Sequence, residues 1–379
     1  MTVPLDPLRP ILSLVLLLSA CSHSDPFTPH DSSVTEPLVA GLPIRLTYNP
    51  GGSLTPGWDP DGTHVIYAFS DPESRQQNDQ CLGMLPRGGG TQTRRLCNDT
   101  PFAADSTDTF SWPAVSAGRR LAYVRASRPV AAQNDLGMRL VYGSLDQSQS
   151  FSTAFTIPFQ TGNGVLYAAV ADIAWLDENR LAFLGLTDTS VKPCPDCQFI
   201  SIRSGRDILL ADLSGETAVV TPVSGTSWAT SVAAASGDGQ IYFTLAGSTQ
   251  VFEKAAPDGP ATTVYDFGVT GLVRDVHAAA GQLVAVVGGL VKVFDSDGNP
   301  IQQDRGGRLF VVDLASGTAR ELPKPATIFR NPALAPDGGS VVAEAYHLTI
   351  LSHPQGEGFP LVVDTVVTGT PELWEFPLR

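Results

Sequence analysis

The sequence predicts an all-β protein, a six-bladed β-propeller whose blades are four-stranded antiparallel sheets. Its 379 residues include 36 Gly and 30 Pro, and no stretch shows a long amphipathic helical pattern. A unit made of a short strand, a tight turn and a continuous apolar strand recurs about every 55 residues. A third strand and then a turn with a fourth strand follow most copies. Four-stranded units repeated at this period are typical of propeller blades.

The first unit, residues 54–69, is the clearest copy. Residues 54–58 predict a short strand, Pro60-Asp61-Gly62 a tight turn, and residues 65–69 a buried strand. Five related units follow, and the six turns centre on residue types that tolerate positive φ: Gly62, Gly118, Asn179, Gly239, Gly281 and Gly338. Asp61 and Asp337 are expected to cap their own turns. Third strands are expected at residues 139–142, 207–212, 250–253, 308–313 and 372–376.

Two features leave open a count of seven blades. Residues 291–299 predict an extra hairpin, and the spacing between the fourth and fifth units is short. The same segment places Asp295, Asp297 and Asn299 at alternate positions, as calcium loops do. Pro300 occupies the position that such loops give to Gly, and no bidentate Glu follows. An Asp-Gly hairpin turn is therefore the preferred interpretation.

The ends of the repeat predict how the ring closes. The last unit has a third strand at residues 372–376 and then too few residues for a fourth. Residues 43–48 precede the first unit at the place an outer strand would occupy. We expect them to pair with the third strand of the last blade, since an open ring would leave an exposed strand edge.

The first 20 residues predict a lipoprotein signal peptide. An apolar core at residues 11–18 is too short to cross a bilayer, and Leu18-Ser19-Ala20-Cys21 resembles the bacterial lipobox, which implies lipidation at Cys21. An ordinary secretory signal is the alternative. Residues 21–42 are rich in Pro, Ser, Thr and Asp and predict a flexible tether, with the propeller at 43–379. Because Ser22, and not Asp, follows the cysteine, the resemblance implies a lipid-anchored protein of the outer membrane, on its periplasmic face or at the cell surface.

The other four cysteines predict disulfides in an exported chain. Cys81 and Cys97 lie equally far from Gly89, so a hairpin turning there would place them opposite each other. Cys194 and Cys197 form a C-x-x-C segment, for which a local disulfide is preferred over a redox pair, half of a zinc site or free thiols.

Residues 44–47 together with Trp58-Asp59-Pro60-Asp61-Gly62 resemble the Pro-Asp-Gly repeat of TolB-like six-bladed propellers, over roughly residues 43–379. The α/β domain of TolB has no counterpart here, so the resemblance implies the fold but not TolB's role. TolB-like propellers also gate prolyl oligopeptidases, but the sequence has no G-x-S-x-G nucleophile motif.

The sequence shows no site that identifies a function, so the fold supports only a class of function. A net charge of -14 lacks the basic footprint of a nucleic-acid binder. The histidines show no metal-ligand spacing, so no metal or other cofactor is expected. His64 and His277 are expected in or beside blade strands. A role as metal ligand or general base at a channel mouth is left open for His277 and His347. Trp58, Trp112 and Trp175 are expected between blades. A non-enzymatic propeller that binds a protein, peptide or glycan is the leading hypothesis, and a lyase, lactonase or cyclotransferase using the axial channel is the alternative.

Overall fold

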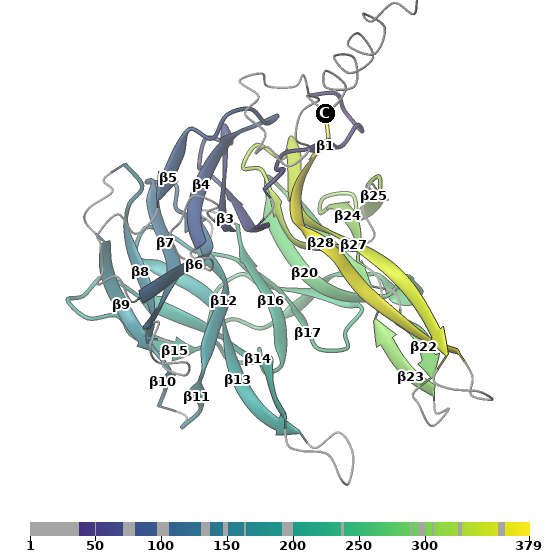
Figure 1. Ribbon diagram of the computed structural model, residues 1–379. Coiled ribbons are helices and arrows are strands. Elements are labelled where there is room, and N and C mark those ends of the chain that lie inside the picture. The colour runs from purple at the N-terminus through teal and green to yellow at the C-terminus, as the bar shows by residue number, and fades with distance from the viewer. Residues whose placement is uncertain are drawn as a thin grey trace, which may run out of the picture.

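The computed structural model is a ring of six four-stranded antiparallel sheets around a central axis (Figure 1). It describes residues 38–49, 51–70, 80–96, 106–129, 137–146, 151–162, 164–191, 200–235, 239–288, 290–294, 300–304, 307–324, 328–354 and 361–379. The signal peptide and most of the tether predicted from the sequence lie outside these residues. No helix in the described ranges has the length and apolar character needed to span a membrane.

The first three blades follow the chain in order, with the inner strand first. Blade 1 contains β2 (Ser53–Trp58), β3 (His64–Ser70), β4 (Gln80–Pro86) and β5 (Arg94–Leu96). Blade 2 contains β6 (Ser106–Val115), β7 (Arg120–Pro129), β8 (Gly137–Ser144) and β9 (Phe151–Ile157). A short hairpin of β10 (Phe159–Gln160) and β11 (Leu166–Tyr167) leads to blade 3, which contains β12 (Ala169–Trp175), β13 (Arg180–Val191), β14 (Ile200–Asp212) and β15 (Val219–Pro222).

The last three blades complete the ring. Blade 4 contains β16 (Ala229–Ala234), β17 (Ile241–Leu245), β18 (Gln250–Lys254) and β19 (Thr262–Asp266), and the 3₁₀ turn η1 (Gly268–Thr270) follows it. Blade 5 contains β20 (Leu272–Ala279), β21 (Gln282–Gly288), β24 (Arg308–Asp313) and β25 (Thr318–Glu321). Blade 6 contains β26 (Ile328–Leu334), β27 (Ser340–Pro354), β28 (Leu361–Pro377) and β1 (Ile44–Arg45).

The predicted extra hairpin does not add a blade. Strands β22 (Leu290–Phe294) and β23 (Pro300–Asp304) pair with each other as a separate two-stranded sheet inserted between β21 and β24. The count is therefore six. The turn that carries Asp295, Asp297 and Asn299 lies outside the described residues, so the calcium-loop alternative is not addressed by the structure.

The ring closes between chain ends, as the sequence predicts. Strand β1 pairs with β28, with Ile44 opposite Glu375 and Arg45 opposite Trp374. Beyond this pair, the Leu46 amide donates to the Leu373 carbonyl at 2.8 Å. Both apolar side chains of the closing segment, Ile44 and Leu46, are buried in a core shared by blades 6 and 1. The N-terminal segment thus serves as the outer strand of the last blade.

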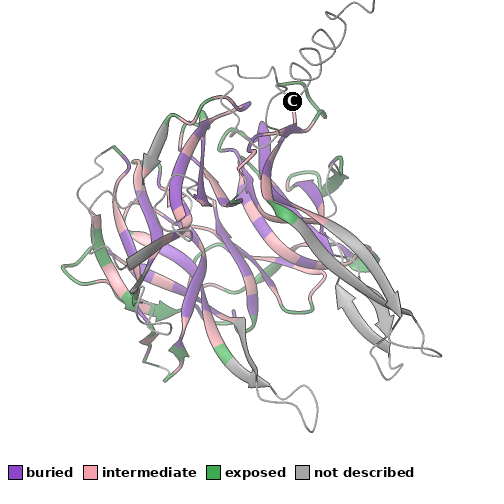
Figure 2. Cartoon of the chain, viewed as in Figure 1, coloured by how far each residue is buried: buried purple, intermediate pink, exposed green. Residues whose placement is uncertain are grey.

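The core consists of apolar clusters between neighbouring blades, because side chains alternate along each middle strand. Buried residues, purple in Figure 2, run along the strands of the blades. In β21, Val284 and Val286 belong to the cluster shared with blade 6. Leu283, Ala285 and Val287 point the other way, into the cluster shared with blade 4. A strand buried on both faces reads as a continuous apolar run, which explains the pattern in the sequence.

The expectation of positive φ at all six turn positions is correct at four of them. Gly62, Gly239, Gly281 and Gly338 have φ between 69° and 70°. In blade 2 the left-handed residue is Arg119, with φ of 61°, and not Gly118. A Cβ at Gly118 would lie 2.5 Å from the Glu178 carboxylate, so that side chain would have to shift if Gly118 were replaced.

The sixth position, Asn179, also lacks a positive φ. Its amide donates to Asp177 Oδ1 at 2.8 Å, so the aspartate side chain two residues earlier shapes this turn.

The two ends of the propeller axis differ in the segments that they carry. All six inner strands run in the same direction along the axis, from one end, which we call the start face, to the other, the turn face. The turn face carries the hairpin turns that come after the inner strands, such as residues 59–63 and 335–339. The start face carries the residues that lead into the inner strands, together with the β13–β14 and β27–β28 hairpins (Figure 1).

Candidate functional site in the axial channel

Each inner strand is bulged at the same height along the axis, as the register shifts of all six β-strand pairs show. The bulges place one residue per blade around the channel, and we call this set the channel ring: Thr55, Trp112, Asp172, Ser231, Asp275 and Asn331. Four of these residues have positive φ, between 45° and 57° for Thr55, Trp112, Asp172 and Asn331. Bulges re-aim side chains, and here they direct them toward the axis.

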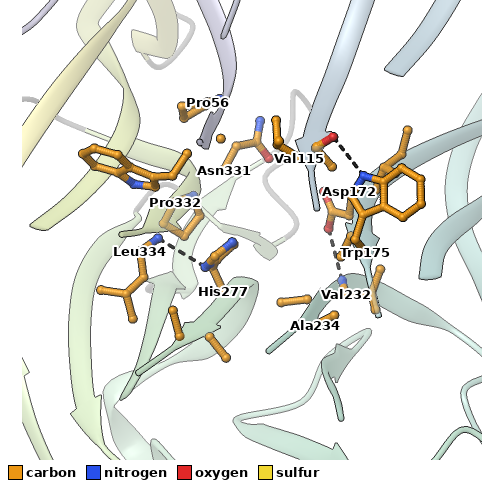
Figure 3. A pocket seen from close by; sticks show the side chains of 18 of the residues that line it. Pro56, Val115, Asp172, Trp175, Val232, Ala234, His277, Asn331, Pro332 and Leu334 are labelled. Carbon is orange, nitrogen blue, oxygen red and sulfur yellow. Dashed lines mark hydrogen bonds between the residues drawn. The ribbon is translucent and has the colours of Figure 1, made fainter. Parts of the chain in front are cut away.

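Ring side chains accept hydrogen bonds from the backbone of the next blade. Asp172 Oδ2 accepts from the Val232 amide at 3.2 Å, as drawn in Figure 3. The same relationship recurs at three other blade junctions: Trp112 N to Thr55 Oγ1 at 3.2 Å, Val276 N to Ser231 Oγ at 3.1 Å, and Asn331 N to Asp275 Oδ2 at 3.2 Å. Two of the donors, Trp112 and Asn331, lie in the bulges without a ladder partner, so these bonds satisfy their amides.

At the junction between blades 6 and 1 a glutamate takes this place. Glu344 on β27 is buried and accepts from the Thr55 amide through Oε1. The same oxygen accepts from Asn331 Nδ2 at 2.7 Å, and Oε2 accepts from the Tyr346 hydroxyl at 2.7 Å. Burial raises the pKa of Glu344, and burial together with the Glu344 charge raises the pKa of Tyr346.

The carboxylates of the ring repel one another electrostatically. The pKa of Asp172 rises to about 7, chiefly because burial disfavours its charged form and also because Asp275 and Glu344 are negatively charged. Hydrogen bonds from Ser231 and Val232 act in the opposite direction. A positively charged group among these carboxylates would relieve both the burial cost and the repulsion.

Above the ring, a cavity of about 190 Å³ extends toward the turn face, and we call it the axial funnel. Its wall is mainly apolar and is formed by side chains from all six inner strands, among them Pro56, Val115, Val232, Ala234 and Leu334 (Figure 3). Pro60, Ala117 and Pro336 line its turn-face end. The funnel therefore combines an apolar wall with a polar, acidic floor.

His277 lines the funnel from β20, in a blade strand as the sequence predicts. Its Nδ1 accepts a hydrogen bond from the Leu334 amide at 3.2 Å (Figure 3). An acceptor nitrogen must be unprotonated, and burial lowers the pKa of His277 to about 4. The imidazole is thus neutral at pH 7, with its proton on Nε2.

The three tryptophans predicted to lie between blades pack against inter-blade cores, Trp58 and Trp175 as buried members and Trp112 from the channel side. Trp58 and Trp175 are buried, and each indole donates across a blade junction, to the Ala333 and Ala114 carbonyls, both at 3.0 Å. Trp112 is only partly buried and occupies a ring position. Its indole has no acceptor atom, so it cannot make the junction bond that the other ring residues make.

Most predicted modification sites lie outside the described residues: Cys21, Cys97, Cys194 and Cys197. Cys81 lies in β4 and is buried. Strands β4 and β5 have the register that symmetry about Gly89 predicts, with Leu82 opposite Leu96, and Gly88, Gly89 and Gly90 all have positive φ in the turn. The bridge between Cys81 and Cys97 stays a prediction. His347 lies in β27, where its Nε2 is 3.9 Å from Glu372.

A group of possible metal ligands occurs in the β2–β3 turn, where Asp59, Asp61 and His64 each place one ligand atom within 4.8 Å of the others. The turn itself uses these atoms. Asp59 Oδ1 accepts from the Thr63 and His64 amides, both at 2.9 Å, and Asp61 Oδ1 accepts from the Thr63 amide at 3.1 Å. Asp337 caps its turn in the same way through the Gly339 amide at 2.8 Å. The predicted capping roles of Asp61 and Asp337 are confirmed.

Sequence reasoning missed the channel ring. A signal was present, because the ring residue stands 6 to 8 positions before each turn residue and precedes Pro in three of the six units. Its types differ, however, from Thr to Trp to Asp. The shared feature is the backbone bulge, which side-chain patterns do not reveal.

The chain is similar to several solved structures. No family model matches the chain, and no curated protein matches it. Among solved structures, U3-55K has a TM-score of 0.50 at 13% identity, covering 89% of this chain and 98% of that one. TolB from Acinetobacter baumannii has a TM-score of 0.48 at 13% identity, and the match spans 84% of this chain but only 64% of TolB. A gluconolactonase from Xanthomonas campestris, XC5397, has a TM-score of 0.48 at 15% identity and 89% coverage of both chains. The chain is a six-bladed β-propeller with structural neighbours among TolB and other propellers.

Proposed function

We propose that the protein is a lipid-anchored protein of the bacterial outer membrane, on its periplasmic face or at the cell surface, whose propeller is a non-enzymatic binding module. In this proposal the axial funnel accepts a cationic group of a protein or peptide partner: a Lys or Arg side chain, or an amino terminus. The observation that carries the proposal is the funnel itself, an apolar cavity that ends on a polar ring with two carboxylates, Asp172 and Asp275.

The size of the funnel favours a single inserted group. Its volume of about 190 Å³ is smaller than the roughly 300–1,000 Å³ of typical small-molecule sites. A side chain with an apolar stem and a charged end matches the wall and the floor at once. A neutral glycan would leave the repulsion between Asp172, Asp275 and Glu344 unrelieved.

The hydrogen bonds argue against a catalytic role for the polar residues of the funnel. Asp172 and Asp275 each hold a backbone amide of the next blade, and Ser231 Oγ accepts from the Val276 amide. His277 Nδ1 accepts from the Leu334 amide and is thereby unavailable as a base. Within the described ranges, these bonds give Asp172, Asp275, Ser231 and His277 a role in joining neighbouring blades.

The alternative is a metal-dependent enzyme of the lactonase type in the same channel. The observation in its favour is that three carboxylates, those of Asp172, Asp275 and Glu344, lie close enough to influence one another. Carboxylates also suit Ca²⁺, Mg²⁺ or Mn²⁺ as ligands. Lactone hydrolysis that requires one of these ions, and that stops on chelation, would support the enzyme and contradict the binding module.

Photo-crosslinking at the funnel mouth tests the proposal in the full mature protein. A benzoyl-phenylalanine at Ala117 should capture partner segments that contain Lys, Arg or an amino terminus. Asp172→Asn keeps the shape and tolerates the positive φ of 48°, yet removes the charge, and should reduce the yield several-fold. The control probe at Val219, an exposed residue of the outer strand β15, should capture nothing that depends on Asp172. Equal yields with Asp172→Asn would contradict the proposal.

A further inference from the structure

The start face carries exposed apolar side chains from three consecutive blades. Leu166, Trp228 and Val269 are 58%, 54% and fully exposed, and each stands a few residues before the inner strand of blade 3, 4 or 5. Because all inner strands begin at the start face, these side chains share that face. It lies opposite the end at which the axial funnel opens.

Trp228 has a backbone conformation that a bulky residue rarely adopts, with φ of 68°. Its amide donates to the Arg206 carbonyl, and its carbonyl accepts from the Ala246 amide at 2.8 Å, so the backbone is fixed on both sides. The side chain makes little use of this position for packing, since more than half of it is exposed. Strain of this kind is concentrated at functional sites.

Arg206 lies over the exposed indole, with its guanidinium carbon 4.5 Å from the ring centroid. Arg206 forms an ion pair with the neighbouring Asp207, with 3.7 Å between Arg206 Nε and Asp207 Oδ2. Both oxygens of Asp207 already accept hydrogen bonds, from the Tyr167 hydroxyl at 2.7 Å and from Ser227 Oγ at 3.1 Å. Among the described residues, Arg206 donates no hydrogen bond. The indole holds the guanidinium in place, and the two terminal nitrogens, which take no part in the ion pair through Nε, are available to a ligand.

We propose that Trp228 and Arg206 form a docking site on the start face for an acidic peptide segment of a partner protein. A carboxylate of the segment pairs with the Arg206 guanidinium, and a neighbouring apolar side chain packs on Trp228. Charge complementarity selects this occupant, because arginine binds carboxylates in a bidentate manner. Trp and Arg are also the residue types that dominate binding energy at interfaces.

The net charge of -14 does not oppose this pairing. At about 0.15 M salt, exposed charges farther apart than about 8 Å are largely screened from each other. A carboxylate bound to Arg206 would be closer than that, so its affinity depends on Arg206 and on the neighbouring Asp207 more than on the net charge. Leu166 and Val269 offer further apolar area on the neighbouring blades.

Fluorescence anisotropy tests the site in the full mature protein, with a detergent blank. The probe is a labelled eight-residue peptide that alternates Glu with Leu, compared with versions that carry Gln or Lys in place of Glu. The Glu peptide should bind tightest. Trp228→Gly removes the indole while allowing the positive φ, so it should keep the melting temperature and weaken binding about tenfold or more. Arg206→Gln should weaken binding to a similar degree.

Two matched controls lie away from the site. Val219→Ala changes an equally exposed apolar residue, and Arg119→Gln changes an exposed arginine on the turn face. Both should bind the Glu peptide like the parent. The inference is overturned if the Glu peptide does not bind, if the Gln or Lys peptide binds as tightly, or if Trp228→Gly retains the affinity. A melting temperature that falls with Trp228→Gly would assign the indole a structural role and overturn it as well. None of these results depends on the axial funnel.

Discussion

The amide of Gly88 in blade 1 donates a 2.8 Å hydrogen bond to the buried carboxylate of Glu375 in blade 6. Arg87 Nε lies 3.4 Å from the other oxygen of this carboxylate, and a second Arg87 nitrogen lies 3.0 Å from Asp337. The first and last blades are therefore joined on the turn face by polar contacts, in addition to the shared apolar core and the strand pair of β1 with β28.

Replacing Glu375 should destabilise the ring at this junction. Glu375→Ala leaves the Gly88 amide without its acceptor and removes the ion pair with Arg87, and an unsatisfied buried donor costs about 1–3 kcal/mol. Glu375→Gln retains an acceptor oxygen and should cost less. Chemical denaturation checks this order. Equal stabilities for the two variants would mean that the acceptor contributes little to closure.

The closing strand should matter far more than the tether. A deletion through Thr47 removes the buried Ile44 and Leu46 side chains, each of which contributes about 1.5–3 kcal/mol, and leaves the edge of β28 unpaired. Deletion of residues 22–40 alone should leave the melting temperature almost unchanged. Thermal melts of both truncations decide the matter, and similar curves would contradict the importance of the closure.

Two groups of the funnel should give opposite dependences of stability on pH. Asp172 has a folded-state pKa of about 7, above its ordinary value of 3.8, so its contribution makes stability fall as pH rises from about 4 to 7. His277 has a folded-state pKa of about 4, below 6.5, so its contribution makes stability rise across about pH 4 to 6.5.

The two dependences partly cancel in the parent protein, and single substitutions should separate them. Melting temperatures between pH 4.5 and 6.5 should slope more steeply downward in His277→Gln than in the parent. They should slope more steeply upward in Asp172→Asn. Asp258→Asn, at an exposed carboxylate, is the control. Parallel profiles for all four proteins would show that neither group titrates as described.

Cys81 and Cys97 should form a disulfide. The register of β4 and β5 pairs Leu82 with Leu96, the neighbouring positions. A bridge closing a loop of this size should contribute on the order of 3 kcal/mol. Non-reducing peptide mapping should find the linked peptides, and replacing both cysteines with Ala should lower the free energy of unfolding. Detection of two free thiols would reject the pairing.

Cys21 should carry the lipid. The lipobox places cleavage before this residue, so the mature protein should show the mass of a lipidated amino-terminal cysteine. Cys21→Ser should move the protein from the membrane to the soluble fraction. An unchanged distribution, with no lipid mass in the parent, would instead support an ordinary secretory signal.

The sequence predicted the blades because each middle strand is buried on both faces. Leu283 to Val287 must all be apolar, whichever neighbouring blade they contact, so the strand stands out as a run of five. Ring closure was predictable for a similar reason, since an unpaired third strand at residues 372–376 requires a partner.

The candidate sites were not predictable in the same way. Asp172 and Asn331 acquire their position from a bulge, and neither residue type is unusual in a strand end or turn. Trp228 and Arg206 are 22 positions apart on two blades, and their contact depends on how blade 3 packs against blade 4. The sequence pattern favoured inter-blade core for tryptophan, which is correct for Trp58 and Trp175 but does not extend to the exposed Trp228.

The position of β1 has a mechanical consequence. The amide of Gly41 bonds to the Pro377 carbonyl at 2.9 Å, so the chain before Leu38 joins the propeller at the rim of the turn face. If a lipid holds the amino terminus, any tension between membrane and partner reaches the fold first through β1. The hydrogen bonds between β1 and β28 would then break one after another from the amino-terminal end. A strong pull would separate β1 from blade 6 before it disturbed the other five blades.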